Sequence, residues 1–188
     1  MQKKMITITI ILLVAFAIAL PIFLVWQNDA TETIAITIGT TFYHFAIRLA
    51  IGHSVNAIMK NRANPRSWWF KEKQGEKAFY RFIKIRKWKK YLPTYNPSSF
   101  DTAHKTIDEI IQASCQAEIV HEIIVVFSFV PIAFAHVLGS PAAFIITSIL
   151  AAAFDSLFIV LQRYNRPKLL KAHKRFTKLQ NRSQDDLQ

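Results

Sequence analysis

The sequence alternates long apolar runs with strongly basic stretches. Residues 5–26 carry no charged side chain over 22 positions, slightly more than the roughly 20 that a helix needs to cross a bilayer. Residues 34–59 contain Arg48 as their only fixed charge. Two further apolar runs, 123–138 and 142–162, are separated by a Gly-Ser-Pro breaker. The pattern predicts an all-α fold, an integral membrane bundle of about four transmembrane helices.

The charged residues are segregated from these runs and indicate an orientation. The chain has a net charge of +12 although 52% of its residues are hydrophobic. Twelve Lys and Arg residues lie between Lys60 and Lys90, and eight more lie in the tail, residues 163–188. Cytoplasmic loops are enriched in Lys and Arg. We therefore expect a single multi-pass domain (1–188) in the cell membrane, with both termini and the basic segment 60–122 in the cytoplasm.

The basic segment is expected to form interfacial helices on the cytoplasmic side. The stretch GEKAFYRFIKIRKWKKYLP predicts one helix that ends at Pro93. Its apolar side chains divide between two faces, with Phe79, Phe82 and Ile83 on one and Ile85, Trp88 and Leu92 on the other. A helix that only floats on lipid should be apolar on one side, so we expect this one to pack against protein as well. A further helix should begin near Ala103 and continue into the third span.

Polar residues recur at helical spacing inside two of the spans. The second span carries a stripe of Thr37, Thr40, His44 and Arg48, and the fourth carries a stripe of Ser148, Asp155, Gln162 and Arg166. Ionisable groups at membrane depth are costly and usually paired or functional. Two interpretations of Arg48 and Asp155 stay open at this point: an ion pair that only holds the bundle together, or a functional pair.

The helix that enters the third span changes character along one face. Ile107, Ile110 and Ile111 mark an apolar stripe, which continues as Ser114, Glu118, His121 and Glu122. One interpretation is a buried histidine satisfied by a carboxylate. The other is a general base held by Glu118 or Glu122, because imidazole titrates near neutral pH and can take a proton from a hydroxyl. The Glu118-x-x-His121 spacing also occurs in di-iron bundles, but the chain has no second such pair, so no metal is expected. The lone Cys115 is expected to be a small helix residue.

Three stretches together resemble a known family. GEKAFYRFIKIRKWKKYLP, QAEIVHE and VLQRYNRPKL occur in the order and approximate spacing of the glycosyl-4,4'-diaponeurosporenoate acyltransferases, and the resemblance covers roughly residues 68–174. It implies transfer of a fatty acyl group to a sugar hydroxyl of a glycosylated carotenoid acid, the closing step toward staphyloxanthin. The matching positions are Glu72, Gly75, Tyr80, Arg86, Trp88, Lys89, Glu118, His121 and residues 162–167.

The expected roles at these positions are our own inference. His121 is the catalytic base and Glu118 orients it. The expected substrate-binding residues are Gln162, Arg163, Tyr164, Asn165, Arg166, Arg86, Trp88, Lys89, Glu72 and Tyr80. Hydrogen-bond donors from residues 163–166 would stabilise the oxyanion on the acyl carbonyl, with Pro167 turning the chain out of the helix. His121 and residues 163–166 should then share one cleft that opens toward the cytoplasm.

The expected partners follow from charge and hydropathy. No cofactor is expected; the acyl donor is acyl-CoA or acyl carrier protein, whose acidic groups the bases of residues 60–90 would attract. The acceptor is a membrane lipid or glycolipid. The same bases suit anchoring on anionic phospholipid, and no nucleic acid is expected. The alternative function is a non-enzymatic small membrane protein that binds lipid or a protein partner through its basic segment.

Overall fold

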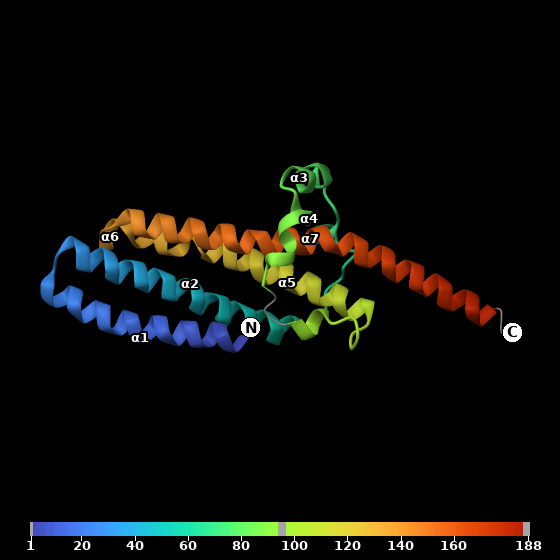
Figure 1. The fold of residues 1–188 in the computed structure, drawn as a ribbon, viewed down its shortest axis with the longest axis horizontal. Coiled ribbons are helices and arrows are strands. Elements are labelled where there is room, and N and C mark those ends of the chain that lie inside the picture. Colours follow the sequence, from blue (N-terminus) through green and yellow to red (C-terminus); the bar gives the residue numbers. More distant parts are fainter. Residues whose placement is uncertain (1, 94–96, 186–188) are drawn as a thin grey trace. The chain divides into compact units, whose positions relative to one another are not determined.

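The computed structural model describes residues 2–93 and 97–185, which form α-helices, short 3₁₀ helices and turns without any strand among them (Figure 1). The predicted all-α fold is therefore confirmed. The chain divides into two compact units. The first unit joins residues 1–58 to 120–157, and the second joins residues 59–119 to 158–188.

In the part of the chain that the structure describes, four helical segments are long and apolar enough to cross a membrane, as the sequence predicted. They are Gln2–Trp26, Asp29–Met59, Ile107–Leu138 and Pro141–Arg182. The first of them, α1 (Gln2–Trp26), buries only Ala19 and exposes many of its Ile, Leu and Val side chains. Such a surface suits contact with lipid hydrocarbon.

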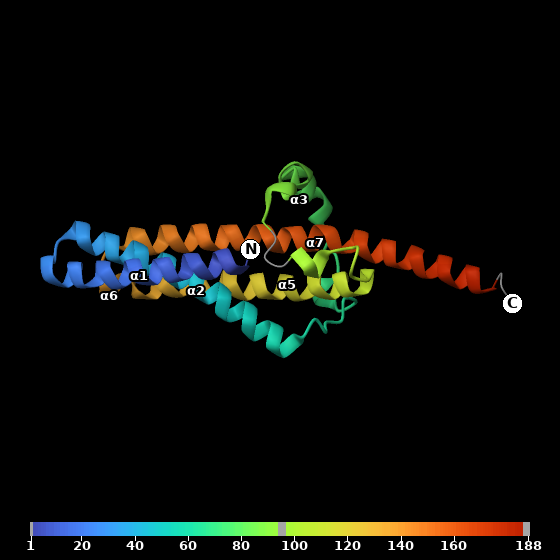
Figure 2. The ribbon, with the colours of Figure 1, turned by 60° about the horizontal axis from the view of Figure 1, so that its bottom comes forward.

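The first unit is built mainly from helices that run along one another. It contains α1, α2 (Asp29–Met59), the end of α5 (Ile107–Phe127), η4 (Val130–Phe134), α6 (Ala135–Leu138) and the start of α7 (Pro141–Asp185). A tight turn joins α1 to α2, and α5 and α7 lie side by side in both views (Figures 1 and 2). Asn28 caps α2, because its Oδ1 accepts a hydrogen bond from the Thr31 N–H at 2.9 Å.

The Gly-Ser-Pro breaker forms the turn that precedes α7. Gly139 has φ +74°, a conformation that favours glycine, and a Cβ at this position would lie 1.9 Å from Glu32 Oε1. The next residue, Ser140, is hydrogen-bonded to the Thr33 hydroxyl at 2.9 Å. Pro141 then occupies the first turn of α7, where its missing N–H is not needed.

The second unit surrounds a small apolar core. Its elements are η1 (Trp68–Phe70), α3 (Glu76–Phe82), α4 (Ile85–Trp88), η2 (Lys89–Tyr91), η3 (Pro97–Phe100), the start of α5 and the end of α7. Phe70, Ile111 and Cys115 are buried together, with Leu169 and Leu170 packed against them. Cys115 is thus a small buried helix residue, as expected. Whether residues 60–122 lie on the membrane surface stays a prediction.

The basic stretch forms two short helices, so the prediction of one continuous helix is wrong. The break falls at Lys84, which has left-handed backbone angles of φ 51° and ψ 42° between α3 and α4. The Trp88 indole N–H donates to the Ile83 carbonyl at 2.8 Å and holds the turn. The two apolar faces of the sequence thus belong to two helices, and Ile85 is buried while Phe82 is exposed.

Pro167 does not turn the chain out of α7, which is a second correction. The helix runs without interruption from Pro141 to Asp185, with Pro167 inside it. A proline in a helix interior costs about 3 kcal/mol because it removes an N–H and crowds the preceding turn. Arg163 and Arg166 stand just before it, and the ion pairs they make to one carboxylate depend on their helical spacing. Those contacts favour an unbroken helix.

Candidate functional site

A carboxylate in the first unit connects an arginine to a histidine. His121 Nδ1 of α5 lies 2.9 Å from Asp155 Oδ1 of α7. The other oxygen of Asp155 accepts a hydrogen bond from Arg48 Nη2 of α2, so the ion pair considered from the sequence is present. Arg48 also donates to the carbonyls of His44, at 2.6 Å, and Ala151, at 3.3 Å.

The contact with Asp155 indicates which ring nitrogen of His121 carries the hydrogen. The side chain of Asp155 is 1% exposed, whereas that of His121 is 21% exposed. An ionised carboxylate accepts a hydrogen bond, so Nδ1 carries the hydrogen and the ring's lone pair lies on Nε2. Arg48 places a positive charge beside this buried carboxylate. The chain Arg48–Asp155–His121 can therefore orient an imidazole for proton transfer.

Several other polar side chains of the same two stripes are buried. Thr40 and His44 are buried on α2, as is Ser148 on α7, whereas Thr37 is exposed. Within the described part of the chain, neither nitrogen of His44 nor the Ser148 hydroxyl has a hydrogen-bond partner. Buried polar groups are normally satisfied by protein, water or ligand. Leaving such groups without a partner costs free energy.

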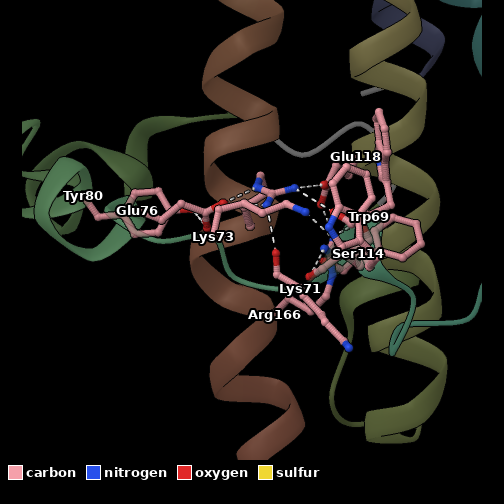
Figure 3. A network of polar contacts seen from close by, with 11 residues as sticks. Trp69, Lys71, Lys73, Glu76, Tyr80, Ser114, Glu118 and Arg166 are labelled. Carbon is pink, nitrogen blue, oxygen red and sulfur yellow. Dashed lines mark hydrogen bonds and ion pairs between the residues drawn. The ribbon is translucent and has the colours of Figure 1, made fainter.

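A second polar network, in the second unit, is centred on Glu118 (Figure 3). Its carboxylate accepts hydrogen bonds from Arg163 Nη1, at 2.7 Å, and from Arg166 Nη2. Arg163 also bonds Glu76 Oε1 through Nε at 3.0 Å and Nη2 at 2.5 Å. Two carboxylates and two guanidinium groups thus balance each other, and Glu118 and Arg166 are almost completely buried.

The same arginines bind the backbone that leads into α3. Arg163 donates to the carbonyls of Trp69, at 3.2 Å, and Lys71, at 3.1 Å. Arg166 donates to the Phe70 carbonyl at 3.4 Å, and its guanidinium lies 4.7 Å from the Phe70 ring centroid. These contacts fasten residues 69–71 to α7. Both arginines are thus bonded to protein groups in this unit, and Arg166 is almost completely buried; their expected contacts to substrate stay a prediction.

Tyr80 extends the network through Glu76. Its hydroxyl donates to Glu76 Oε2 at 2.7 Å, and its ring stands edge-on to Tyr164 at 5.5 Å between centroids. Burial, followed by the hydrogen bond to Glu76, raises the pKa of the Tyr80 phenol. The phenol is therefore protonated at neutral pH and acts as a donor.

The remaining expected substrate-binding residues are spread over the second unit. Tyr164 accepts a hydrogen bond from Arg86 Nε at 3.1 Å, and Asn165 accepts one from Lys89 Nζ at 3.3 Å. The indole N–H of Trp88 is hydrogen-bonded to the Ile83 carbonyl, in the turn before α4. Glu72 is paired with Lys77 at 3.5 Å. Gln162 is buried.

The side-chain contacts in the structure differ from those expected from the sequence. Asp155 contacts His121, while both oxygens of Glu118, expected to orient this histidine, bind arginines. The stripe containing Asp155 was visible, but its partner depends on how the helices pack. Glu76 was missed as a site residue, although its spacing of four from Tyr80 could have indicated the contact. His121 and residues 163–166 belong to different units, so a shared cleft stays a prediction.

Among residues 2–93 and 97–185, no group of three His, Cys, Asp or Glu side chains is placed to hold a metal ion. The di-iron pattern in particular would need Glu118 as a ligand. This carboxylate is bonded to two guanidinium groups instead.

The chain matches the model of a known protein family. A family model described as glycosyl-4,4'-diaponeurosporenoate acyltransferase matches residues 65–175. This stretch contains both the Glu118 network and the His121–Asp155 contact. No curated protein and no solved structure matches the chain.

Proposed function

The chain belongs to the glycosyl-4,4'-diaponeurosporenoate acyltransferase family, whose model matches more than half of its length, and from this premise we propose that it transfers a fatty acyl group to a sugar hydroxyl of a glycosylated carotenoid acid. The chain is an acyltransferase with four candidate membrane spans. Its family thus favours an enzyme over a protein that only binds lipid or a partner. An amphiphilic acceptor fits an enzyme embedded in a membrane.

The observation that carries the catalytic proposal is the hydrogen bond between His121 Nδ1 and buried Asp155. Nε2 of His121 takes the proton from the acceptor hydroxyl, and the oxygen attacks the carbonyl carbon of an acyl thioester. The carbon–sulfur bond then breaks, and the thiol leaves with the proton that His121 returns. Asp155 stabilises the imidazolium formed between these steps.

The acyl donor in this proposal is acyl-CoA or acylated acyl carrier protein. Tyr164 and Asn165 are partly exposed and remain candidates for contacts to the substrates. We place both termini and the basic segment 60–122 on the cytoplasmic side, where such donors are found and where anionic phospholipid would attract the bases.

Lipid mass spectrometry of cells that produce the glycosylated carotenoid acid tests both the reaction and its acceptor. Cells with the protein should contain a species heavier than the acceptor by one fatty acyl group, and cells without it should lack this species. His121→Gln should abolish the species. His136→Gln is the matched control, because His136 is an exposed histidine of the same unit.

The outcomes separate the parts of the proposal. A heavier product derived from a different glycolipid would correct the acceptor and keep the reaction. Full product formation by His121→Gln, at an equal protein level, would remove His121 as the base.

A further inference from the structure

Three cationic side chains gather around one tyrosine of the second unit. Arg86 donates through Nε to the Tyr164 hydroxyl at 3.1 Å. Lys168 Nζ lies 3.3 Å from the centroid of the Tyr164 ring, and Lys89 Nζ lies 5.2 Å from it. Two helices thus supply the charges, α4 with the start of η2 on one side and α7 on the other.

Within the described residues, none of Arg86, Lys89 and Lys168 forms an ion pair with a carboxylate. The nearby acids Glu76 and Glu118 are already paired with arginines. Cations held close together repel one another, and a bound anion removes this repulsion. The arrangement therefore favours binding of an anion.

Tyr164, at the centre of this cluster, also packs against Tyr80. Its ring stands at 82° to that of Tyr80, whose hydroxyl is bonded to Glu76 in the buried network. On the α4 side, the left-handed conformation of Lys84 redirects the chain so that Arg86 and Lys89 reach α7. Such conformations are costly for a residue other than glycine and tend to occur at functional sites.

We infer that Arg86, Lys89 and Lys168 form a binding site for a phosphate group. Guanidinium groups bind phosphate with two parallel hydrogen bonds, and ammonium groups add point charges. Beyond Nε, the terminal nitrogens of Arg86 have no partner among the described residues, and its side chain and that of Lys168 are exposed. The inference rests on the proposed function in one respect: the phosphate is that of the acyl-thioester donor. The other source of the same chemistry is a phospholipid headgroup.

Coenzyme A is the probe, and its affinity for the purified full-length protein in maltoside micelles is the measurement. The double variant Arg86→Gln/Lys168→Gln should bind coenzyme A about tenfold more weakly or worse, since a hydrogen bond to a charged group contributes at least this factor. Lys171→Gln/Lys174→Gln is the matched control, because it removes two exposed bases of α7 that lie outside residues 60–90. It should bind coenzyme A like the parent protein.

A parallel arm measures phosphatidylglycerol retained by each variant in native mass spectrometry. If the double variant loses phosphatidylglycerol but binds coenzyme A normally, the phosphate belongs to a lipid and the donor assignment is overturned. If neither ligand is affected more than in the control, the phosphate site itself is overturned. These readouts involve no turnover. A failed site with intact acyl transfer in cells therefore contradicts only this inference, whereas absence of the acylated product contradicts the proposed function.

Discussion

Replacing Glu118 by glutamine should destabilise the second unit strongly. The network contains Glu76 and Glu118 against Arg163 and Arg166, so the substitution leaves one positive charge uncompensated. Arg166 is 1% exposed and cannot turn to water. Removing one partner of a buried ion pair typically costs about 3–5 kcal/mol. For a chain of this size we expect the unfolding midpoint to fall by roughly 6–20 °C.

Tryptophan fluorescence during thermal unfolding in detergent measures this effect. Three of the four tryptophans, Trp68, Trp69 and Trp88, belong to the second unit. Asp108→Asn is the control, because Asp108 is an exposed carboxylate on the same helix and its loss should change the free energy of unfolding by about 0.5 kcal/mol or less.

A double variant tests the electrostatic reason directly. Glu118→Gln with Arg166→Met removes the unpaired cation as well and should recover part of the lost stability. The reasoning is refuted if Glu118→Gln unfolds at the same temperature as Asp108→Asn, or if Arg166→Met adds fully to its effect.

Three further sets of substitutions test separate features. Either Arg48→Asp or Asp155→Arg alone should lower the yield of folded protein in membranes, and the two together should restore it; no recovery would mean that the ion pair does not hold the bundle. His44→Leu should leave the unfolding midpoint unchanged or raise it, since burying a polar group without a partner costs about 1–3 kcal/mol; a large drop would show that the ring has a partner. Lys84→Gly should raise the unfolding midpoint and Lys84→Val should lower it, because the left-handed conformation costs a side chain about 1–2 kcal/mol, and equal midpoints would contradict the strained turn.

Much of the fold could be predicted because lipid imposes a simple rule on the sequence. The spans follow from uninterrupted apolar length, and the polar stripes of α2 and α7 follow from helical spacing. The break between the two helices of the basic segment was harder to predict. Nothing in the residues around Lys84 marks a left-handed turn, although the two apolar faces around it were a sign that one straight helix could not satisfy both.

The sequence predicted which residues belong to the candidate site better than it predicted the contacts between them. His121 and Glu118 lie three apart on one helix, and spacing alone suggested that they act together. In the structure, Asp155 contacts His121, and Glu118 binds the arginines of α7. Which carboxylate meets which base depends on how three helices rotate against each other, and this information is not contained in the periodicity of a single segment.

The rate of acyl transfer by purified His121→Gln protein tests the central claim most directly. The assay uses equal amounts of folded protein, saturating acyl donor and the glycosylated carotenoid acid, with His136→Gln as the control. General base catalysis typically contributes about 10²–10⁴-fold to a rate, so His121→Gln should be slower by a factor in this range while the control keeps the parent rate. A His121→Gln rate equal to that of the parent would contradict the account.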